Sequence, residues 1–274
     1  MGDVRLTING QDVQAPAGCT LLTAARGAGI YIPTLCHHPD LPPAKGSRVA
    51  KAVFQGRNRI ENAMPHEAGK GCGLCVVEVE GEADLVGSCG TEAKAGMVVI
   101  TDNGRIREKR MEDLVPILTR HSHACLTCAQ QEGCSRSQCS SNVPEEERCC
   151  TRFGHCELQN VAHYIGISPA TPKWTPTNLP IFKEDPLFES DYNLCIGCTR
   201  CVRACRDLRG VEAIGFVYDK AGQVRIGTLG PTLQESGCKF CMACVAVCPT
   251  GALMDKSVRP GKREEDLVPC KEAC

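Results

Sequence analysis

Two matched cysteine runs near the end of the chain have the spacing of ligands for paired iron–sulfur clusters. The first run contains Cys195, Cys198, Cys201 and Cys205, and the second contains Cys238, Cys241, Cys244 and Cys248. Three thiolates separated by two residues each can hold three corners of a cubane, while the fourth cysteine of the run ligates the other cluster. We therefore expect Cys248 to complete the first [4Fe–4S] site and Cys205 the second. Two such runs in tandem predict electron transfer.

The composition is consistent with a fold that is organised around metal. The chain has 274 residues, enough for about two domains, and 22 of them are cysteines, whereas only 4% are aromatic. Few large rings are therefore available to build a core, but metal ligation can supply folding free energy in their place.

The sequence disfavours a disulfide scaffold, a membrane span and a nucleic-acid surface. Disulfide scaffolds belong to short secreted chains, but the opening MGDVRLTINGQDVQ lacks the pattern of a signal peptide, so we expect a cytoplasmic protein. No run reaches the roughly 18 apolar residues of a membrane span. The net charge of −1, with scattered Lys and Arg, does not favour a nucleic-acid surface. A zinc-binding structural module is the alternative from another class.

The N-terminal residues predict the opening of a β-grasp ferredoxin domain. Residues 4–8 and 11–15 alternate between apolar and polar and flank Asn9-Gly10, a strong hairpin signal. Thr20 is placed as the N-cap of a short helix, LLTAARGAG, and Cys36 follows in a loop.

The further cysteines of this region complete a four-ligand set. Cys72 and Cys75 lie in a glycine-rich segment before an alternating strand, VVEVE, and Cys89 follows. With Cys36, this set resembles that of plant-type ferredoxins, which hold a [2Fe–2S] cluster. The stretch between Cys36 and Cys72 is long, at 35 residues, and AVFQGRNRI within it predicts a small hairpin. We interpret this stretch as a surface insertion, because a longer loop costs little free energy.

A histidine and three cysteines follow the ferredoxin-like region. Residues 97–101 predict its last strand, and 104–121 have helical spacing. His121 then precedes Cys125, Cys128 and Cys134. A neutral imidazole can replace a thiolate on iron, although a histidine at a helix C-terminus is also favoured by the helix dipole. The three neighbouring cysteines favour His121 as a ligand.

The order of these motifs resembles one known family. IPTLCHHPDL, GCGLCVVEVEG, ELQNVAHYIGI and YNLCIGCTRCVRAC are similar to segments in the N-terminal part of the large iron–sulfur subunit of respiratory complex I. The same part occurs in NAD-linked iron-only hydrogenases, NAD-dependent formate dehydrogenases and flavin-based electron-bifurcating complexes. The resemblance covers about residues 3–255 and implies one [2Fe–2S] and three [4Fe–4S] clusters.

The chain departs from that family in a cysteine-rich insertion and in its tail. In the family ELQ directly follows the third cysteine of the histidine segment, but here it follows Cys156. Either Cys156 or Cys134 therefore completes the His121 cluster. If Cys156 does, the remaining cysteines of the insertion are candidate ligands of an additional [4Fe–4S] centre: Cys134, Cys139, Cys149 and Cys150. Cys270 and Cys274 in the tail are candidate ligands of a further module.

The predicted fold is α+β, with modules joined by a proline-rich segment. The expected boundaries are 1–103 for the [2Fe–2S] domain (insertion about 45–70), 104–167 for the His–Cys domain with insertion 134–156, 168–190 for an extended linker, 191–256 for the two-[4Fe–4S] domain and 257–274 for the tail. Five prolines in 168–186 disfavour a helix, and we expect Trp174, Phe182 and Phe188 to pin this linker to the surface.

The sequence contains neither G-x-G-x-x-G after a strand nor a P-loop, so we expect no substrate-turnover site in this chain. A hydride carries two electrons and a cluster accepts one, so a flavin must lie between them. The resemblance implies that FMN or FAD and NAD(P) belong to a complex I-like flavoprotein partner, accompanied by a small [2Fe–2S] subunit, with a terminal redox subunit beyond. It also implies an electron order from the [2Fe–2S] centre through the His-ligated cubane to the tandem cubanes, in either direction. The predicted role is an electron-transfer subunit of an NAD(P)H-linked oxidoreductase, a bifurcating complex included; a free-standing polyferredoxin carrier is the alternative.

Overall fold

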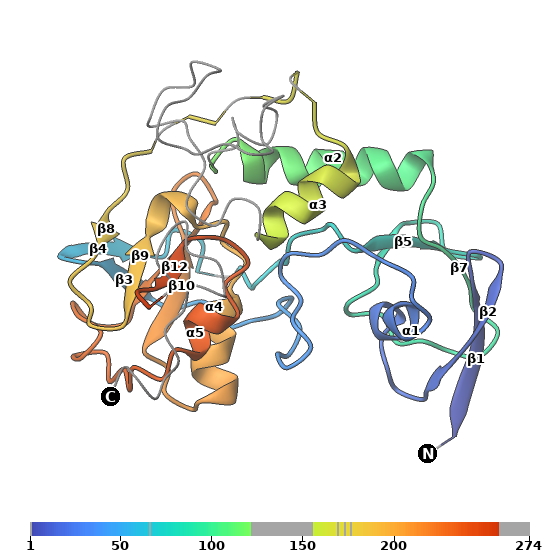
Figure 1. Cartoon of the computed structure of the whole chain (residues 1–274), viewed down its shortest axis with the longest axis horizontal. Coiled ribbons are helices and arrows are strands. Elements are labelled where there is room, and N and C mark those ends of the chain that lie inside the picture. Colours follow the sequence, from blue (N-terminus) through green and yellow to red (C-terminus); the bar gives the residue numbers. More distant parts are fainter. Residues whose placement is uncertain are drawn as a thin grey trace.

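The computed structural model describes residues 2–65, 67–121, 156–168, 170–172, 174–175 and 177–257. The elements of residues 3–27 and 76–100 lie at one end and those of residues 181–255 at the other, and helices α2 (Gly104–Leu118) and α3 (Glu157–Ile165) lie between them (Figure 1). No described helix has both the length and the apolar character that crossing a membrane requires.

The N-terminal domain is a five-stranded sheet with one helix. Its elements are β1 (Asp3–Ile8), β2 (Gln11–Pro16), α1 (Leu21–Gly27), β5 (Val76–Val79), β6 (Val86–Gly87) and β7 (Val98–Ile100). The strand order is β2-β1-β7-β5-β6, and β1 runs parallel to β7. The predicted hairpin is confirmed, with Asn9 and Gly10 both at positive φ (52° and 79°), as a tight hairpin turn requires.

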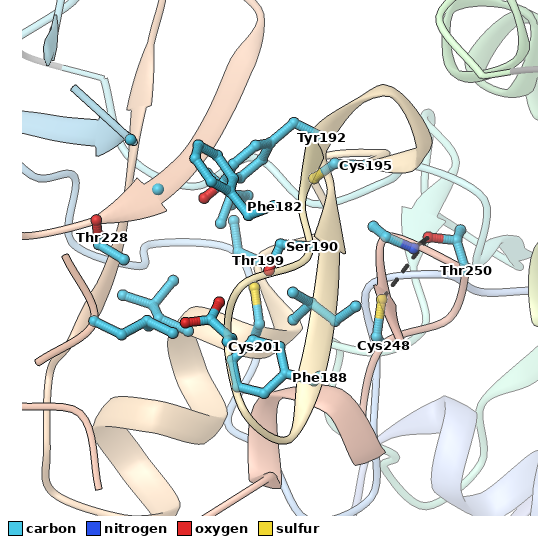
Figure 2. Close-up of a pocket in the computed structure, with 18 of the residues that line it drawn as sticks. Phe182, Phe188, Ser190, Tyr192, Cys195, Thr199, Cys201, Thr228, Cys248 and Thr250 are labelled. Atoms are coloured by element: carbon cyan, nitrogen blue, oxygen red, sulfur yellow. Dashed lines mark hydrogen bonds between the residues drawn. The ribbon is translucent and has the colours of Figure 1, made fainter. Parts of the chain in front are cut away.

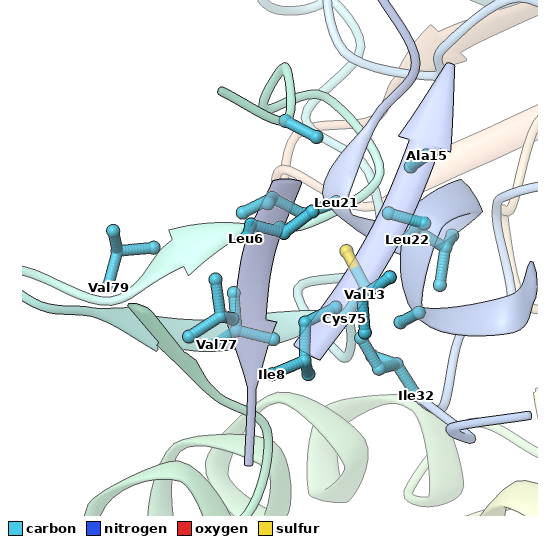
Figure 3. Close-up of a cluster of buried hydrophobic side chains, with 14 residues drawn as sticks. Leu6, Ile8, Val13, Ala15, Leu21, Leu22, Ile32, Cys75, Val77 and Val79 are labelled. Carbon is cyan, nitrogen blue, oxygen red and sulfur yellow. The ribbon is translucent and has the colours of Figure 1, made fainter. Parts of the chain in front are cut away.

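The core of this domain explains why α1 forms where it does. Thr20 caps the helix by accepting a hydrogen bond from the Thr23 amide, which confirms the predicted N-cap. The buried face of α1, with Leu21 and Leu22, packs against side chains from β1, β2 and β5 (Figure 3). The thiol-bearing Cys75 lies in the same cluster (Figure 3), so this core also positions a predicted ligand.

The predicted hairpin of the long stretch after Cys36 forms, but it is not a surface insertion. Strands β3 (Ala52–Gln55) and β4 (Asn58–Glu61) join β10 (Ile214–Tyr218) and β11 (Val224–Thr228) in a four-stranded sheet of order β10-β11-β3-β4. Val53 is fully buried, and Gln55 Nε2 donates to the Ile226 carbonyl at 2.9 Å. Pairing with a distant strand satisfies backbone groups of β11 and buries the apolar side of the hairpin.

Helices α2 (Gly104–Leu118) and α3 (Glu157–Ile165) connect the two ends of the molecule. The predicted helix over 104–121 is confirmed, but it ends at Leu118. Its buried face meets α3 in an apolar cluster that also contains Leu35, Leu74 and Ile196, residues that lie beside predicted ligands in three different loops. The loops around the cysteines therefore share one core.

The C-terminal region contains the remaining elements. These are β8 (Ile181–Phe182), β9 (Phe188–Asp191), the 3₁₀ turn Tyr192–Leu194, α4 (Arg200–Arg203), the π-helical turn Ala204–Leu208, α5 (Ala243–Ala246) and β12 (Leu253–Asp255). Strands β8 and β9 form a sheet with β12, so part of the expected linker is built into this region. Phe188 is buried and Phe182 packs edge-on against Tyr192, so both side chains attach the segment to this region.

Candidate metal centres

The four cysteines predicted to hold a [2Fe–2S] cluster come together in the structure. The Cys36 thiol is in hydrogen-bond contact with those of Cys72 and Cys89, and the Cys89 thiol also contacts that of Cys75. Backbone amides point at the same sulfurs: Leu35 donates to Cys72 Sγ and Cys72 donates to Cys36 Sγ, each at 3.4 Å. Amides aimed at sulfur favour the thiolate form that binds metal.

Hydrogen bonds among these four thiols lower the pKa of some of them and raise the pKa of others. Hydrogen bonds from the thiols of Cys72 and Cys89 lower the pKa of Cys36 to about 2. A hydrogen bond from the Cys89 thiol lowers the pKa of Cys75 to about 7. The pKa of Cys72 is raised, first by its hydrogen bond to Cys36 and then by burial. Lowered pKa values at two of the four thiols suit a cationic metal group, because metal ligands must be deprotonated.

The first run of the C-terminal region surrounds a cavity of about 440 Å³. Cys195, Cys198 and Cys201 line it together with Cys248, which comes from the second run. Figure 2 shows the sulfur atoms of Cys195, Cys201 and Cys248 around this space. The pKa values of Cys195 and Cys198 are raised to about 11 and about 12, chiefly by burial and also by the nearby Cys248 thiol. Four thiols that line one cavity fit a group that brings positive iron to them.

The second run gathers around the complementary cysteine. Burial raises the pKa of Cys244 to about 12, and the neighbouring thiols of Cys238, Cys205 and Cys241 add to this shift. Amides again point at sulfur: Ala213 donates to Cys205 Sγ at 3.2 Å and Phe240 donates to Cys238 Sγ at 3.3 Å. Cys241 is exposed, unlike the other members of either group. The structure thus brings Cys205 to the second run and Cys248 to the first.

The two runs also repeat at the level of the backbone. Gly197 and Thr199, on either side of Cys198, have positive φ values of 69° and 58°. Phe240 and Met242 flank Cys241 in the same way, at 51° and 60°. A left-handed backbone conformation is unfavourable for residues other than glycine. Its recurrence at matching positions indicates that each loop is bent so that its sulfur atoms point inward.

The predicted His–Cys site is only partly described. His121 and Cys156 are both buried, at 4% and 7% exposure, and Cys156 is the N-cap residue of α3. The other candidate ligands lie outside the described residues: Cys125, Cys128, Cys134, Cys139, Cys149, Cys150, Cys270 and Cys274. Among the described residues, no three Cys, His, Asp or Glu side chains are grouped so as to hold a single metal ion; a cluster differs because its ligands bind different irons.

A buried arginine that the sequence analysis missed joins two of the cysteine loops. Arg203 is fully buried, and its guanidinium donates to the carbonyl oxygens of Cys36 and Pro42 and, at 3.4 Å, to that of Cys198. Its position in the sequence could have indicated this, because Arg203 lies between the predicted ligands Cys201 and Cys205. A side chain at that position is expected to be buried together with them.

A second arginine of the same helix joins α4 to α3. Arg200 is 2% exposed and donates to both carboxylate oxygens of Glu157 at 2.8 Å, and to the Val247 carbonyl at 3.4 Å. Glu157 follows Cys156 and Val247 precedes Cys248. Arg200 therefore links the sequence neighbours of two predicted ligands.

Comparison with known families agrees with these sites. The "2Fe-2S iron-sulfur cluster binding domain" matches residues 2–44 and 41–104, and the "4Fe-4S dicluster domain" matches residues 194–252. The fold and the cysteine groups thus define an iron–sulfur electron-transfer protein with both domain types.

Its relatives are subunits of larger oxidoreductases. A subunit of the NADH-quinone oxidoreductase of Rhizobium meliloti (strain 1021) is 30% identical over 99% of this chain, which spans 26% of that protein. NADP-reducing hydrogenase subunit HndD of Solidesulfovibrio fructosivorans is 28% identical over 93% of this chain, which spans 36% of it. NADPH-Fe(3+) oxidoreductase subunit alpha of Geobacter sulfurreducens (strain ATCC 51573 / DSM 12127 / PCA) is 28% identical over 92% of this chain, which spans 24% of it.

A solved structure shares the fold over the whole chain. A chain of an NAD+-reducing [NiFe]-hydrogenase in the H2-reduced state superposes with a TM-score of 0.66, at 23% identity, covering 98% of both chains. The predicted resemblance to the N-terminal iron–sulfur region of the complex I large subunit and its relatives is confirmed by these matches. The chain spans about a quarter to a third of the length of the three relatives described above.

Proposed function

We propose that the chain relays electrons between a flavin-containing, NAD(P)H-oxidising partner and another redox subunit of a multi-subunit complex. The observation that carries this proposal is the grouping of twelve cysteines into three sets of four, drawn from distant parts of the sequence. Relatives named as NADH- and NADPH-linked oxidoreductase subunits support the same role.

The proposed ligand sets follow the three groups. Cys36, Cys72, Cys75 and Cys89 hold the [2Fe–2S] cluster; Cys195, Cys198, Cys201 and Cys248 hold the first cubane, and Cys238, Cys241, Cys244 and Cys205 hold the second. His121, Cys125, Cys128 and either Cys156 or Cys134 hold a third cubane. When bound, such clusters supply one-electron chemistry. The chain's own contribution is to enclose most of the ligand thiols, with Cys241 exposed, and to aim amides at sulfur, which stabilises negative charge there.

The [2Fe–2S] loop and the first cubane loop are the best candidates for a direct electron step. The Arg203 guanidinium reaches the carbonyl oxygens of Cys36 and Cys198, so these two ligand residues lie within one side chain's span. This contact favours direct electron transfer between the [2Fe–2S] site and the first cubane site. The order expected from the sequence instead had the His-ligated cubane between them.

The partners follow from the chemistry of hydride oxidation. A hydride carries two electrons, so a flavin in a partner similar to the complex I flavoprotein must mediate, alongside a small [2Fe–2S] subunit. We place the protein in the cytoplasm, because cysteines that bind iron must stay reduced and a reducing compartment keeps them so. Electron bifurcation is one form that such a complex can take.

Isolation of the chain with its native partners tests the proposal. NADH or NADPH should bleach the visible absorption of the clusters under anaerobic conditions, and removal of the flavoprotein should abolish the bleaching. If the chain purifies without a partner and carries electrons only between small donors and acceptors, a free-standing polyferredoxin carrier replaces the relay.

A further inference from the structure

Three arginines are almost completely buried among the described residues: Arg110, Arg200 and Arg203. An isolated charge in a low-dielectric interior is costly, so each needs a compensating partner. Arg200 has one, because the carboxylate of Glu157 accepts two hydrogen bonds from it. Arg110 donates to the carbonyl oxygens of Leu74 and Val76, both in the N-terminal domain.

Arg203 differs from Arg200 in the charge of its partners. Its guanidinium donates only to backbone carbonyls, and within the described part of the chain it forms no ion pair with a carboxylate. Its Nε is also buried without a hydrogen-bond partner there. Carbonyl dipoles satisfy some of its donors but supply no net negative charge, so the cation and one N–H remain uncompensated by the described side chains.

The groups beside Arg203 that would become negative on binding metal are cysteine thiols. Cys36, Cys198 and Cys201 are the thiols that interact with it electrostatically, and they belong to two different predicted clusters. A cluster held by four thiolates carries net negative charge, which grows by one unit on reduction. Such a group on each side would compensate the buried cation and accept its free N–H.

We propose that Arg203 is the counter-ion shared by the [2Fe–2S] cluster at Cys36 and the first [4Fe–4S] cluster at Cys198. This inference rests on the proposed cluster assignments. A fixed cation beside a cluster stabilises its reduced state and so raises its reduction potential. One buried charge thereby keeps two successive sites reducible, and its fork of donors holds their loops in contact.

Potentiometric EPR titration of the assembled complex tests this role. In Arg203→Gln the charge is lost, and the reduced-to-oxidised ratio of both clusters at a fixed potential should fall about tenfold, equivalent to about 59 mV for a one-electron couple. In Arg203→Lys the charge is kept but the fork is lost, and both ratios should stay within about threefold of the wild type. The cubane whose reduction potential shifts in Arg203→Gln should be the one whose EPR signal is lost in Cys195→Ser.

Arg107→Gln provides the control. It also removes one arginine charge, but Arg107 is exposed and pairs with Asp102, so solvent screening should leave both potentials unchanged. If Arg203→Gln has the same cluster potentials as the wild type, or if Arg203→Gln and Arg203→Lys shift the potentials equally, the charge of Arg203 has no effect. Arg203 would then only hold the two loops together. If Arg203→Gln fails to retain iron, Arg203→Lys decides: retention of iron with wild-type potentials supports the counter-ion, and loss of iron overturns it.

The wild-type protein separates this inference from the proposed function. Absence of [2Fe–2S] and cubane signals in the wild type would reject the cluster assignments themselves. If these signals are present while the variants leave their potentials unchanged, the cluster assignments stand and only the counter-ion role is wrong.

Discussion

The Glu157 carboxylate accepts two hydrogen bonds from the Arg200 guanidinium, each 2.8 Å long. Arg200 is 2% exposed, whereas the Glu157 side chain is 51% exposed. The pair therefore compensates a buried charge from the surface side. It also fixes the first turn of α3, which begins after Cys156, against the helix that follows Cys198.

Loss of the Glu157 carboxylate should destabilise this junction. Glu157→Ala leaves a buried guanidinium without its charged partner, which costs about 1–3 kcal/mol. Faster bleaching of the cluster absorption in urea, under anaerobic conditions, is the expected readout. Glu61→Ala is the control, because Glu61 pairs with Arg59 on the surface and such pairs contribute about 1 kcal/mol or less. Similar bleaching rates for both variants would contradict the proposed importance of the buried pair.

The cluster content should be measurable directly. Anaerobically purified protein should be brown and contain about fourteen iron atoms per chain, the sum of one [2Fe–2S] and three [4Fe–4S] clusters. About eighteen irons would indicate an additional cubane at Cys134, Cys139, Cys149 and Cys150. A colourless protein loaded with zinc would reject the electron-transfer role.

The crossed ligand sets predict which pairs of variants are redundant. Cys248→Ser combined with Cys195→Ser removes two ligands of the same cubane, so about four irons should be lost. Cys248→Ser combined with Cys238→Ser touches both cubanes, and about eight should be lost. The reverse ranking in iron analysis would mean that each run holds its own cluster.

The histidine ligand should set the potential of its cluster. His121→Cys replaces a neutral imidazole by a charged thiolate, which stabilises the oxidised state. The midpoint potential of one cubane should fall, by on the order of 100 mV, in redox-poised EPR. His123→Cys is the matched variant two residues away, and a shift in that protein alone would move the assignment to His123.

The contact between the hairpin β3–β4 and strand β11 depends on a glycine. A Cβ at Gly227 would lie 2.4 Å from the Phe54 carbonyl oxygen, so Gly227→Ala must push the strands apart, at about 1–3 kcal/mol. Gly104→Ala is the control, because no atom lies within 4 Å of the added carbon. Equal stability of the two proteins toward urea would mean that the sheet yields without strain.

Local sequence patterns were sufficient to predict the features that depend on neighbouring residues. The turn at Asn9-Gly10, the cap at Thr20 and the spacing of each cysteine run are local, because a few residues in one loop or helix end decide them. The crossed positions of Cys205 and Cys248 were also predictable, since a fourth cysteine on the helix leaving such a loop points to the adjacent cluster.

Contacts between distant segments became visible only in the folded chain. The hairpin of residues 52–61 was expected on the surface. Instead, its strand β3 pairs with β11 and its Val53 side chain is buried, so the hairpin belongs to a sheet with the C-terminal region. Arg203 was not recognised as a candidate, because its hydrogen-bond partner, the carbonyl oxygen of Cys36, lies far away in sequence. Pairing between separate strands and compensation of a buried charge depend on the whole folded chain, and no local pattern of residues encodes them.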